Sequence, residues 1–349
     1  MAVTDSFAPA ASITLIAPGM GAALRQSVVS IGDKGAVSLL AGRGGVKQAW
    51  DRRELHEASL QTWQRGLLAV LGLESRQFAS GPISARGDAL LVTDREEMSK
   101  DYWLHGDLVH LAAGLDRLTF LPLTGPAAVT VAEREGLAPL ISGHLQNSPL
   151  RLRTGAKGQW FLHSSRPLDL QTASPDAATA NELEAVMPSG AAAGELRRVM
   201  TECQMLLHDH DVNERRQRRG LPAINSLWPW GGGVLMPQSP RSLPQMFADD
   251  EFSRGIYRLH SLDVESAPPN ASALLQRATL SKPVVAVIAA ESPAVLESEW
   301  IDPLVTALRA GRIRRVDLVL DEWHIHATRG MLRSFWRKPL PVSAWPMST

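Results

Sequence analysis

The sequence predicts an α/β protein in which a mostly parallel sheet carries helices on both faces and a small α+β subdomain is inserted into the larger domain. Short, unbroken apolar runs recur along the chain, and helical stretches separate them. Such runs are typical of strands that are buried on both faces of a parallel sheet. The middle of the chain instead alternates apolar and polar residues between turn residues, which predicts the insertion.

Four apolar runs are expected to form strands of the main sheet, and three amphipathic stretches are expected to cover it. The strands are Ile13–Ala17, Ala223–Trp228, Pro283–Ala289 and Arg315–Leu320, and the helices are Leu55–Leu71, Gly194–Leu207 and Ser298–Ala310. Glycine turns follow two of the strands, at residues 18–21 and 230–233. Because sites in open α/β sheets gather at the carboxyl ends of the strands, we expect a functional site there.

The inserted subdomain is predicted to span residues 96–188, which leaves residues 1–95 and 189–349 for the α/β core. Its expected strands are Tyr102–Leu111, Arg117–Pro122, Ala127–Ala132, Leu150–Arg153 and Gln159–His163, with one helix over Glu133–Leu145. Residues 165–194 are rich in alanine, serine and proline, and we interpret them as the linker that returns to the core.

Composition narrows the classes of function. The 349 residues hold 36 Lys and Arg against 36 Asp and Glu, and this balance argues against a nucleic-acid partner. The single cysteine, Cys203, lies in an apolar helical stretch and is expected to be buried, in a reducing compartment. No apolar run approaches the roughly 20 residues of a membrane helix, and no basic region precedes the first apolar run. We therefore expect a cytoplasmic protein without a membrane partner.

The segment Glu202–Pro237 carries an unusual set of polar groups. A run of four arginines lies close to two amides and three consecutive glycines; the arginines are Arg215, Arg216, Arg218 and Arg219, and the amides are Asn213 and Asn225. Guanidinium groups, amides and exposed backbone N–H groups bind phosphate or carboxylate. On a helix the arginines point in different directions, so one or two are expected to face inward while the others are solvated. The alternative is a wholly solvated basic helix.

The same segment resembles a known family. HDHDVNERRQRRGLPAINSLWPWGGG (208–233) is similar to the signature of archaeal-type cofactor-independent phosphoglycerate mutases, which belong to the alkaline phosphatase superfamily. The whole chain resembles bacterial proteins known as RpfE-type regulatory, or phosphoglycerate-mutase-like, proteins. The supporting motifs are APGMG (17–21), YWLHGDLVHL (102–111), LDRLTF (115–120), QWFLH (159–163) and FWRKP (335–339).

The resemblance implies an alkaline-phosphatase-like core with an inserted subdomain, and it implies which residues bind a ligand. Matched to the signature, these are Asn213, Arg216, Gly220, Asn225, Trp230, Gly231 and Gly233. We expect Trp228 and Trp230 to pack the insertion against the core, with stacking on a ligand as the alternative.

Catalytic members of the superfamily have a serine or threonine nucleophile beside two metal ions, and the first ligand is an aspartate at the end of the opening strand. Here that strand runs into Pro18–Gly19, and proline offers no ligand atom. Asp321, His324 and His326 follow a predicted strand and suit Mn²⁺ or Zn²⁺ as replacement ligands, with an ordinary strand end as the alternative.

Other polar motifs give weaker predictions. Ser38, Ser80 and Ser84 lie in the region where the superfamily carries its nucleophile, but none has a recognisable setting. In the run HDHD (208–211), Asp211 or the nearby Asn213 is expected to cap the following helix. AGRGG (41–45), with Arg43, forms either an ordinary turn or an anion-binding nest.

We therefore expect a phosphoglycerate-mutase-like protein without the full dimetal catalytic set, acting as a regulatory or small-anion-binding relative. No cofactor is expected in that case, and the ligand is a small phosphorylated or carboxylate molecule. One alternative is an active metal-dependent phosphomutase or phosphatase that uses Mn or Zn. Another is a scaffold that binds a protein partner through the basic, tryptophan-containing tail (328–346), which we expect to form a short helix and a proline-rich segment packed on the body.

Overall fold

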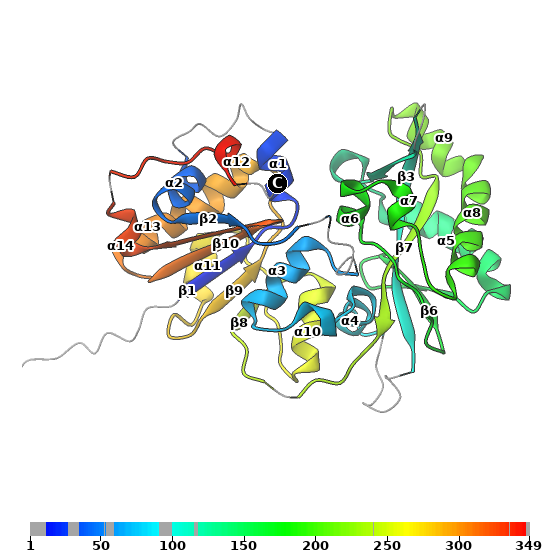
Figure 1. The fold of residues 1–349 in the computed structure, drawn as a ribbon, viewed down its shortest axis with the longest axis horizontal. Helices are drawn as coiled ribbons and strands as arrows, with labels where there is room; N and C mark the ends of the chain where they lie inside the picture. Colours follow the sequence, from blue (N-terminus) through cyan, green and yellow to red (C-terminus); the bar gives the residue numbers. More distant parts are fainter. Residues whose placement is uncertain are drawn as a thin grey trace, which may run out of the picture. The chain divides into compact units, whose positions relative to one another are not determined.

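A computed structural model describes residues 12–26, 35–51, 53, 59–90, 100–114, 118–239, 241–334 and 336–346. The chain forms two compact units, coloured mainly blue, orange and red, and mainly green, in Figure 1. The first unit comprises Met1–Asp51, Thr62–Leu73 and Pro240–Thr349, and the second comprises Arg52–Gln61 and Glu74–Ser239. The predicted insertion, residues 96–188, falls inside the second unit, which continues on both sides of it.

The first unit is built on a six-stranded, mostly parallel sheet with strand order β2-β11-β10-β1-β9-β8. Strands β1 (Ser12–Ile16), β8 (Gln245–Phe247), β9 (Val284–Val287) and β10 (Arg315–Leu320) pair in parallel, and β11 (Trp323–Thr328) and β2 (Gly45–Gln48) add antiparallel pairs at one edge. Three of the four predicted strands, those beginning at Ile13, Pro283 and Arg315, are confirmed. They were recognisable because strands in this position are buried and carry unbroken apolar runs.

Helices lie on both faces of this sheet, as predicted (Figure 1). The unit contains α1 (Met20–Gln26), α2 (Ala36–Arg43), α3 (Thr62–Val70), α10 (Glu251–Leu259), α11 (Ala271–Arg277), α12 (Pro293–Val295), the π-helical turn η5 (Leu296–Ile301), α13 (Asp302–Ala310) and α14 (Arg329–Leu332). The predicted helix Ser298–Ala310 is confirmed as η5 and α13. Of the predicted helix Leu55–Leu71, α3 forms the later part, residues 59–61 are not helical, which corrects the prediction there, and residues 54–58 lie outside the described residues.

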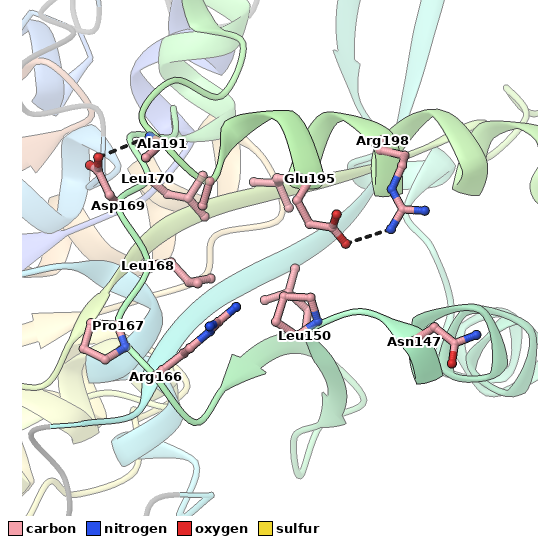
Figure 2. A pocket seen from close by; sticks show the side chains of 13 residues that line it. Asn147, Leu150, Arg166, Pro167, Leu168, Asp169, Leu170, Ala191, Glu195 and Arg198 are labelled. Atoms are coloured by element: carbon pink, nitrogen blue, oxygen red, sulfur yellow. Dashed lines mark hydrogen bonds and ion pairs between the residues drawn. The ribbon is translucent and has the colours of Figure 1, made fainter.

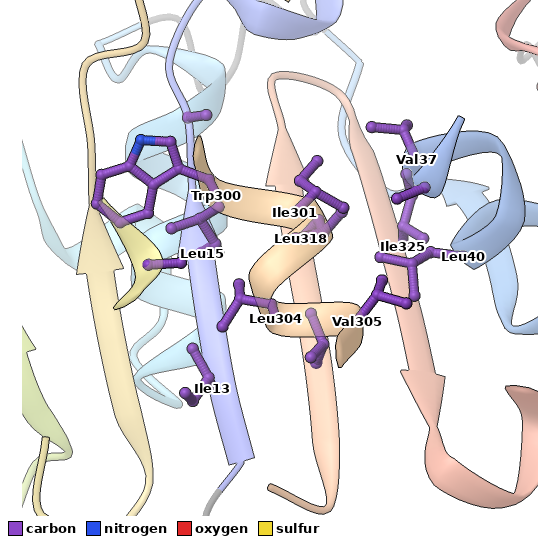
Figure 3. Close-up of a cluster of buried hydrophobic side chains, with 14 of the residues drawn as sticks. Ile13, Leu15, Val37, Leu40, Trp300, Ile301, Leu304, Val305, Leu318 and Ile325 are labelled. Atoms are coloured by element: carbon purple, nitrogen blue, oxygen red, sulfur yellow. The ribbon is translucent and has the colours of Figure 1, made fainter. Parts of the chain in front are cut away.

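The main core lies between one face of the sheet and the helices α2, η5 and α13. Leu15, Leu318 and Ile325 point from the strands toward Trp300 and Leu304 of η5 and α13 (Figure 3). On the other face α3 packs closely against β10, because a side chain at Gly66 would place its Cβ 2.7 Å from Val319. The sheet is therefore buried on both sides.

The second unit contains a separate antiparallel sheet. Its strand order is β4-β3-β6-β5, with β7 also paired to β3, and the strands are β3 (Tyr102–Ala113), β4 (Leu118–Pro122), β5 (Arg151–Thr154), β6 (Trp160–Ser164) and β7 (Ser226–Val234). The prediction that Ala223–Trp228 is a strand of the parallel sheet is wrong, because β7 pairs antiparallel with β3. An apolar run specifies burial but not its pairing partner.

The helices of the second unit cover this antiparallel sheet. They are α4 (Ser80–Gly87), α5 (Val131–His144), α6 (Pro175–Ala180), α7 (Leu183–Val186), α8 (Ala193–His208) and α9 (Asp211–Arg218), with single 3-10 turns η2 (Ser75–Gln77), η3 (Gly125–Ala127) and η4 (Leu145–Asn147). The predicted helix Gly194–Leu207 exists as α8, but it packs on β7 in the second unit and not on the parallel sheet. Its residue Cys203 is fully buried, as predicted.

The predicted strand Ala127–Ala132 is wrong, because a helix begins within it. Thr130 accepts a hydrogen bond from the backbone N–H of Glu133, and the Glu133 carboxylate accepts from the N–H of Thr130. This capping box fixes the start of α5 and outweighs the β propensity of the preceding valine and threonine. The predicted helix Glu133–Leu145 is α5 with its first turn added.

The carboxyl-terminal tail packs back on the first unit, as predicted. After α14 the backbone N–H of Leu340 donates to the carbonyl of Ser38, and a 3-10 turn, η6 (Val342–Ala344), follows. Trp345 is buried edge-to-face against Trp323 at a centroid distance of 5.4 Å. None of the described helices is long and apolar enough to cross a membrane.

The glycines of the WPWGGG motif allow helix α4 to approach the backbone of β3 and β7. Gly231 has φ +68°, and a side chain there would place its Cβ 2.9 Å from the Cβ of Ser80. A side chain at Gly81 would place its Cβ 2.5 Å from the carbonyl oxygen of Trp103. Glycine fits where two backbones approach this closely, and it adopts a positive φ without the strain that a side chain adds.

We predict that Gly231→Ala lowers the free energy of unfolding by about 2 kcal/mol or more, because it combines a clash with backbone strain. The matched control is Gly136→Ala within helix α5, where the new Cβ would lie 3.8 Å from Val212, an ordinary contact. That change should stabilise the chain by about 0.5–1 kcal/mol through helix propensity. Urea denaturation of both variants measures the difference, and equal stabilities would contradict the close-packing explanation.

Candidate functional site

The two amides of the signature segment hydrogen bond to the protein backbone. Asn213 donates to the carbonyls of Leu207 and Ile224 and accepts from the N–H of Ile224, each at 2.7 Å. Asn225 accepts from the N–H of Leu111 at 2.7 Å and donates to its carbonyl at 2.9 Å. Asn213 thus joins the end of α8 to the chain before β7, and Asn225 holds that chain to β3. Both amides therefore use their oxygen and their NH₂ group on backbone partners within the protein.

Arg216 is the buried member of the arginine run. Its Nε donates to the carbonyl of Pro222 at 2.7 Å, its Nη2 donates to the carbonyl of Ala127 at 2.5 Å, and its Nη1 lies 3.1 Å from both carboxylate oxygens of Glu133. The side chain has no exposed surface. The neighbouring Arg215, Arg218 and Arg219 are exposed, which confirms that the run faces both inward and outward.

Arg216 also sets the charge state of its partner. Burial alone would raise the pKa of Glu133, but hydrogen bonds from Thr130 and Arg216 outweigh it and hold that pKa below its ordinary value. The guanidinium therefore neutralises a carboxylate of the protein itself. This arrangement does not favour binding of an external anion at Arg216.

Of the remaining predicted ligand residues, Trp230, Gly231 and Gly233 face other parts of the second unit, and Gly220 is exposed. Trp230 donates from its indole N–H to Asp107 at 2.8 Å and stacks on His105, with ring centroids 4.2 Å apart and planes 16° apart. Gly220 has φ +68° just after helix α9, and a Cβ at Gly233 would lie 2.6 Å from that of Ala79. Trp228 is buried and donates to the carbonyl of Ala173. The structure places the seven predicted residues in one unit, and all except the exposed Gly220 make contacts within that unit.

One pair of buried side chains, Ser80 and His105, has the residue types of a serine nucleophile and its general base. The Oγ of Ser80 is 2.9 Å from Nε2 of His105, the spacing of a serine nucleophile and its base. However, Ser80 has no exposed surface and His105 is 5% exposed. Ser80 was among the predicted nucleophile candidates, but His105 was missed because the two residues are 25 positions apart in sequence. Ser38 and Ser84 are likewise buried.

The buried environment shifts the pKa values of His105 and of the nearby Asp107 in the direction that favours the neutral forms. Burial lowers the pKa of His105 to about 3. Burial also raises the pKa of Asp107, and the hydrogen bond from Trp230 acts in the opposite direction. The Ser80–His105 pair is a buried polar connection between α4 and β3, and it lacks the access that a substrate requires.

The three predicted metal ligands are divided between two environments. Asp321 occupies the turn between β10 and β11 with φ +50°, and its carboxylate accepts from the N–H groups of Gly19 at 2.6 Å and Ala22 at 3.1 Å. It therefore caps helix α1, which follows β1. His324 and His326 lie on one face of β11, with ring centroids 6.2 Å apart.

His324 is engaged by a different carboxylate. Its Nε2 lies 2.8 Å from Asp317 on β10, and Arg315 binds both oxygens of Asp317, from Nε at 2.5 Å and Nη2 at 2.7 Å. Although burial raises the pKa of Asp317, the bonds from His324 and Arg315 lower it overall. Arg315 thus supplies the positive charge that a metal ion would supply. Within the described residues, no three histidine, cysteine or carboxylate side chains gather as a group suited to hold a metal ion.

The two weaker motifs have structural contacts as well. Helix α9 is capped by His210, whose Nδ1 accepts from the N–H of Val212 at 3.2 Å, so the prediction of Asp211 or Asn213 as the cap is wrong. In AGRGG, a Cβ at Gly44 would lie 2.0 Å from the carbonyl oxygen of His326, and Arg43 donates to the carbonyl of Leu332. These contacts pack helix α2 on β11 and the tail, and they do not favour an anion nest.

Comparison with known proteins gives structural similarity only. No protein-family model matches the chain, and no curated protein sequence matches it. A cofactor-independent phosphoglycerate mutase from Thermoplasma acidophilum is 16% identical with a TM-score of 0.42, and the match covers 97% of this chain and 96% of that one. The PH0037 protein from Pyrococcus horikoshii is 14% identical with a TM-score of 0.44, and the match covers 92% of this chain and 88% of that one.

We predict that Arg216→Met lowers the free energy of unfolding by about 3–5 kcal/mol, because it leaves the largely buried Glu133 without its partner. The matched control is Arg218→Met in the same helix, whose side chain is 72% exposed. That change should alter stability by no more than about 0.5 kcal/mol. Chemical denaturation measures both, and similar effects at the two positions would contradict the structural role of Arg216.

We predict that acid destabilises the protein partly through His105. Because the pKa of His105 is lowered from 6.5 to about 3 in the folded chain, the unfolded chain binds a proton first as the pH falls. The contribution of His105 to stability is therefore fully present above pH 6.5 and declines below it, by about 1.4 kcal/mol per pH unit. NMR of labelled histidine, assigned by signal loss in His105→Asn, should show an uncharged ring at pH 5. A ring already charged at that pH would refute the prediction.

Proposed function

We propose that this chain is a phosphoglycerate-mutase-like protein that works by binding a small phosphorylated or carboxylate ligand, in a regulatory role, and not by metal-dependent phosphoryl transfer. The signature at residues 208–233 supports the family, and the chain-wide resemblance to RpfE-type proteins supports the regulatory role. The observation that carries the proposal is the arrangement at the carboxyl end of β1.

At that end of β1, groups of the protein take the place of a metal site. Pro18 stands where the resemblance implies the first aspartate ligand, and its side chain offers no ligand atom. The neighbouring N–H groups of Gly19 and Ala22 point at Asp321, one of the predicted ligands, and bond to its two carboxylate oxygens. An aspartate held in this way stabilises the helix start through capping and the helix dipole. Its carboxylate is directed toward the start of α1.

A second candidate function is metal-dependent phosphomutase or phosphatase activity. The observation that favours it is the pair His324 and His326, whose imidazoles share one face of β11. Imidazoles with a carboxylate suit Zn²⁺ or Mn²⁺. To bind metal here, Asp317 would have to release Arg315, which holds both of its oxygens. We favour the binding function for this reason.

We predict that the protein retains no stoichiometric Mn²⁺ or Zn²⁺ after incubation and desalting, and that it does not interconvert phosphoglycerates when Mn²⁺ is added. Elemental mass spectrometry and a coupled assay with 3-phosphoglycerate measure the two properties. Asp321→Asn should lower stability by about 1 kcal/mol through the weakened cap, with no change in metal content. His324→Ala is the control for metal binding on β11.

Two outcomes would contradict the proposal. Retention of metal that His324→Ala removes, together with Mn²⁺-dependent turnover, would establish the enzymatic alternative. Metal loss in Asp321→Asn without loss of stability would show that Asp321 is a ligand and not a cap.

A further inference from the structure

We infer that a cavity of about 560 Å³ in the second unit binds a small amphipathic molecule with one anionic head group, a carboxylate or a phosphate monoester. The inference rests on the proposed function, since it names the place and class of the ligand. The cavity lies between the residues around η4, the chain after β6 and the first turns of α8; its lining includes Leu150, Arg166, Leu168, Asp169, Leu196 and Arg198 (Figure 2). Its volume is typical of small-molecule sites.

The floor of the cavity is apolar and rigid. Leu150 and Leu196 are each 1% exposed and belong to the core cluster between the antiparallel sheet and helices α5 and α8. Leu168 and Leu170 are half-buried and pack against the same cluster. Leu150 and Leu196 therefore lie beneath the cavity surface and support Leu168 and Leu170, which provide the preformed apolar surface for the body of a ligand.

Arg166 supplies the positive group at this cavity. Its backbone is fixed by Ser164, whose Oγ donates to the carbonyl of Arg166 at 2.9 Å and accepts from its N–H at 3.3 Å. The side chain extends from the chain after β6 into the cavity, toward Leu150 and Glu195 (Figure 2). Among the described residues, no carboxylate pairs with its guanidinium. An arginine whose guanidinium has no carboxylate partner can bind a carboxylate or phosphate with two parallel hydrogen bonds.

The other charged side chains of the lining have contacts within the protein, and only Arg198 and Glu195 among them form an ion pair. Arg198 lies 2.8 Å from Glu195 and 3.3 Å from Glu202. Asp169 accepts from the N–H of Ala191 at 3.2 Å, and its carbonyl accepts from the N–H of Ala192. Among the described residues of the lining, Arg166 is therefore a cation without a carboxylate partner beside an apolar floor, and Asp169 is a carboxylate without a cation partner. Because Asp169 and Glu195 add negative charge to the lining, a ligand with a single anionic group at Arg166 fits better than a polyanion such as a nucleoside triphosphate.

The test uses the full chain and four probes: hexanoate, hexyl phosphate, hexan-1-ol and inorganic phosphate. Saturation-transfer NMR and calorimetric titration measure binding. We expect hexanoate or hexyl phosphate to bind about tenfold more tightly than either hexan-1-ol or inorganic phosphate, because only they engage both the floor and Arg166. The tighter of the two identifies the head group as carboxylate or phosphate.

Two variants locate the binding. Arg166→Leu should weaken binding of the anionic probes about tenfold and leave hexan-1-ol unchanged. Ala191→Trp places a large side chain on the exposed rim of the cavity and should abolish binding of all alkyl probes. The matched control is Arg218→Leu, since Arg218 is exposed on α9 and does not line the cavity. Circular dichroism confirms that each variant folds.

Three results would overturn the inference: no binding of either anionic probe at millimolar concentration, equal binding by Arg166→Leu and the unchanged chain, or an effect of Arg218→Leu as large as that of Arg166→Leu. Each is independent of the metal and turnover measurements. Mn²⁺-dependent turnover would contradict the proposed function, but binding of the probes would still support the ligand site in the cavity. Absence of probe binding would contradict the ligand site, and it would not change the conclusion from the metal measurement.

Discussion

The packing of the second unit depends on the hydrogen bonds of the buried Arg216 guanidinium. It joins the chain before β7, through Pro222, to the start of helix α5, through Ala127 and Glu133. Glu133 completes the capping box of that helix at the same time. Removing a charge from water costs several kcal/mol, and only a full set of hydrogen bonds offsets this cost. The planar fork of arginine provides that set in one rigid group, and the single ammonium of lysine does not. The neighbouring Asn213 and Asn225 extend the same network to α8 and β3.

This network explains why the sequence indicates a ligand site at residues 208–233. Guanidinium groups, amides and glycine-rich backbone bind carboxylate and carbonyl oxygens, whether these belong to a ligand or to the protein. Residue types alone do not distinguish the two cases, because the difference lies in which segments meet. The partner of Arg216, Glu133, is 83 residues away, and the partner of Asn225, Leu111, is 114 residues away. No spacing rule connects positions so distant.

The parts of the fold that the sequence predicts well are those fixed by local pattern. Strands β1, β9 and β10 carry unbroken apolar runs because both faces of the parallel sheet are covered. The assignment of β7 to that sheet failed because an apolar run does not specify a pairing partner. The error at residues 127–132 was avoidable: Thr130 followed by Glu133 is a capping box, and that signal is present in the sequence. The cavity lining was hidden for another reason, since residues 165–194 have the composition of a linker, yet they form two short helices and one wall of the cavity.

The contrast between the two units limits where an external anion would bind. In the first unit Arg315 forms an ion pair with Asp317, and the start of helix α1 donates hydrogen bonds to Asp321. The carboxylates at the predicted metal ligands therefore have partners within the protein. In the second unit Arg216 forms an ion pair with Glu133, whereas Arg166 lines the cavity without a carboxylate partner among the described residues. An exposed arginine alone holds an anion weakly, because water screens the attraction and an exposed ion pair contributes only about 0.2–1 kcal/mol. Useful affinity must therefore come from the leucine floor beside it. An inorganic anion would bind only Arg166, and an apolar molecule would contact only the leucine side chains. We therefore infer an amphipathic ligand, which makes both interactions.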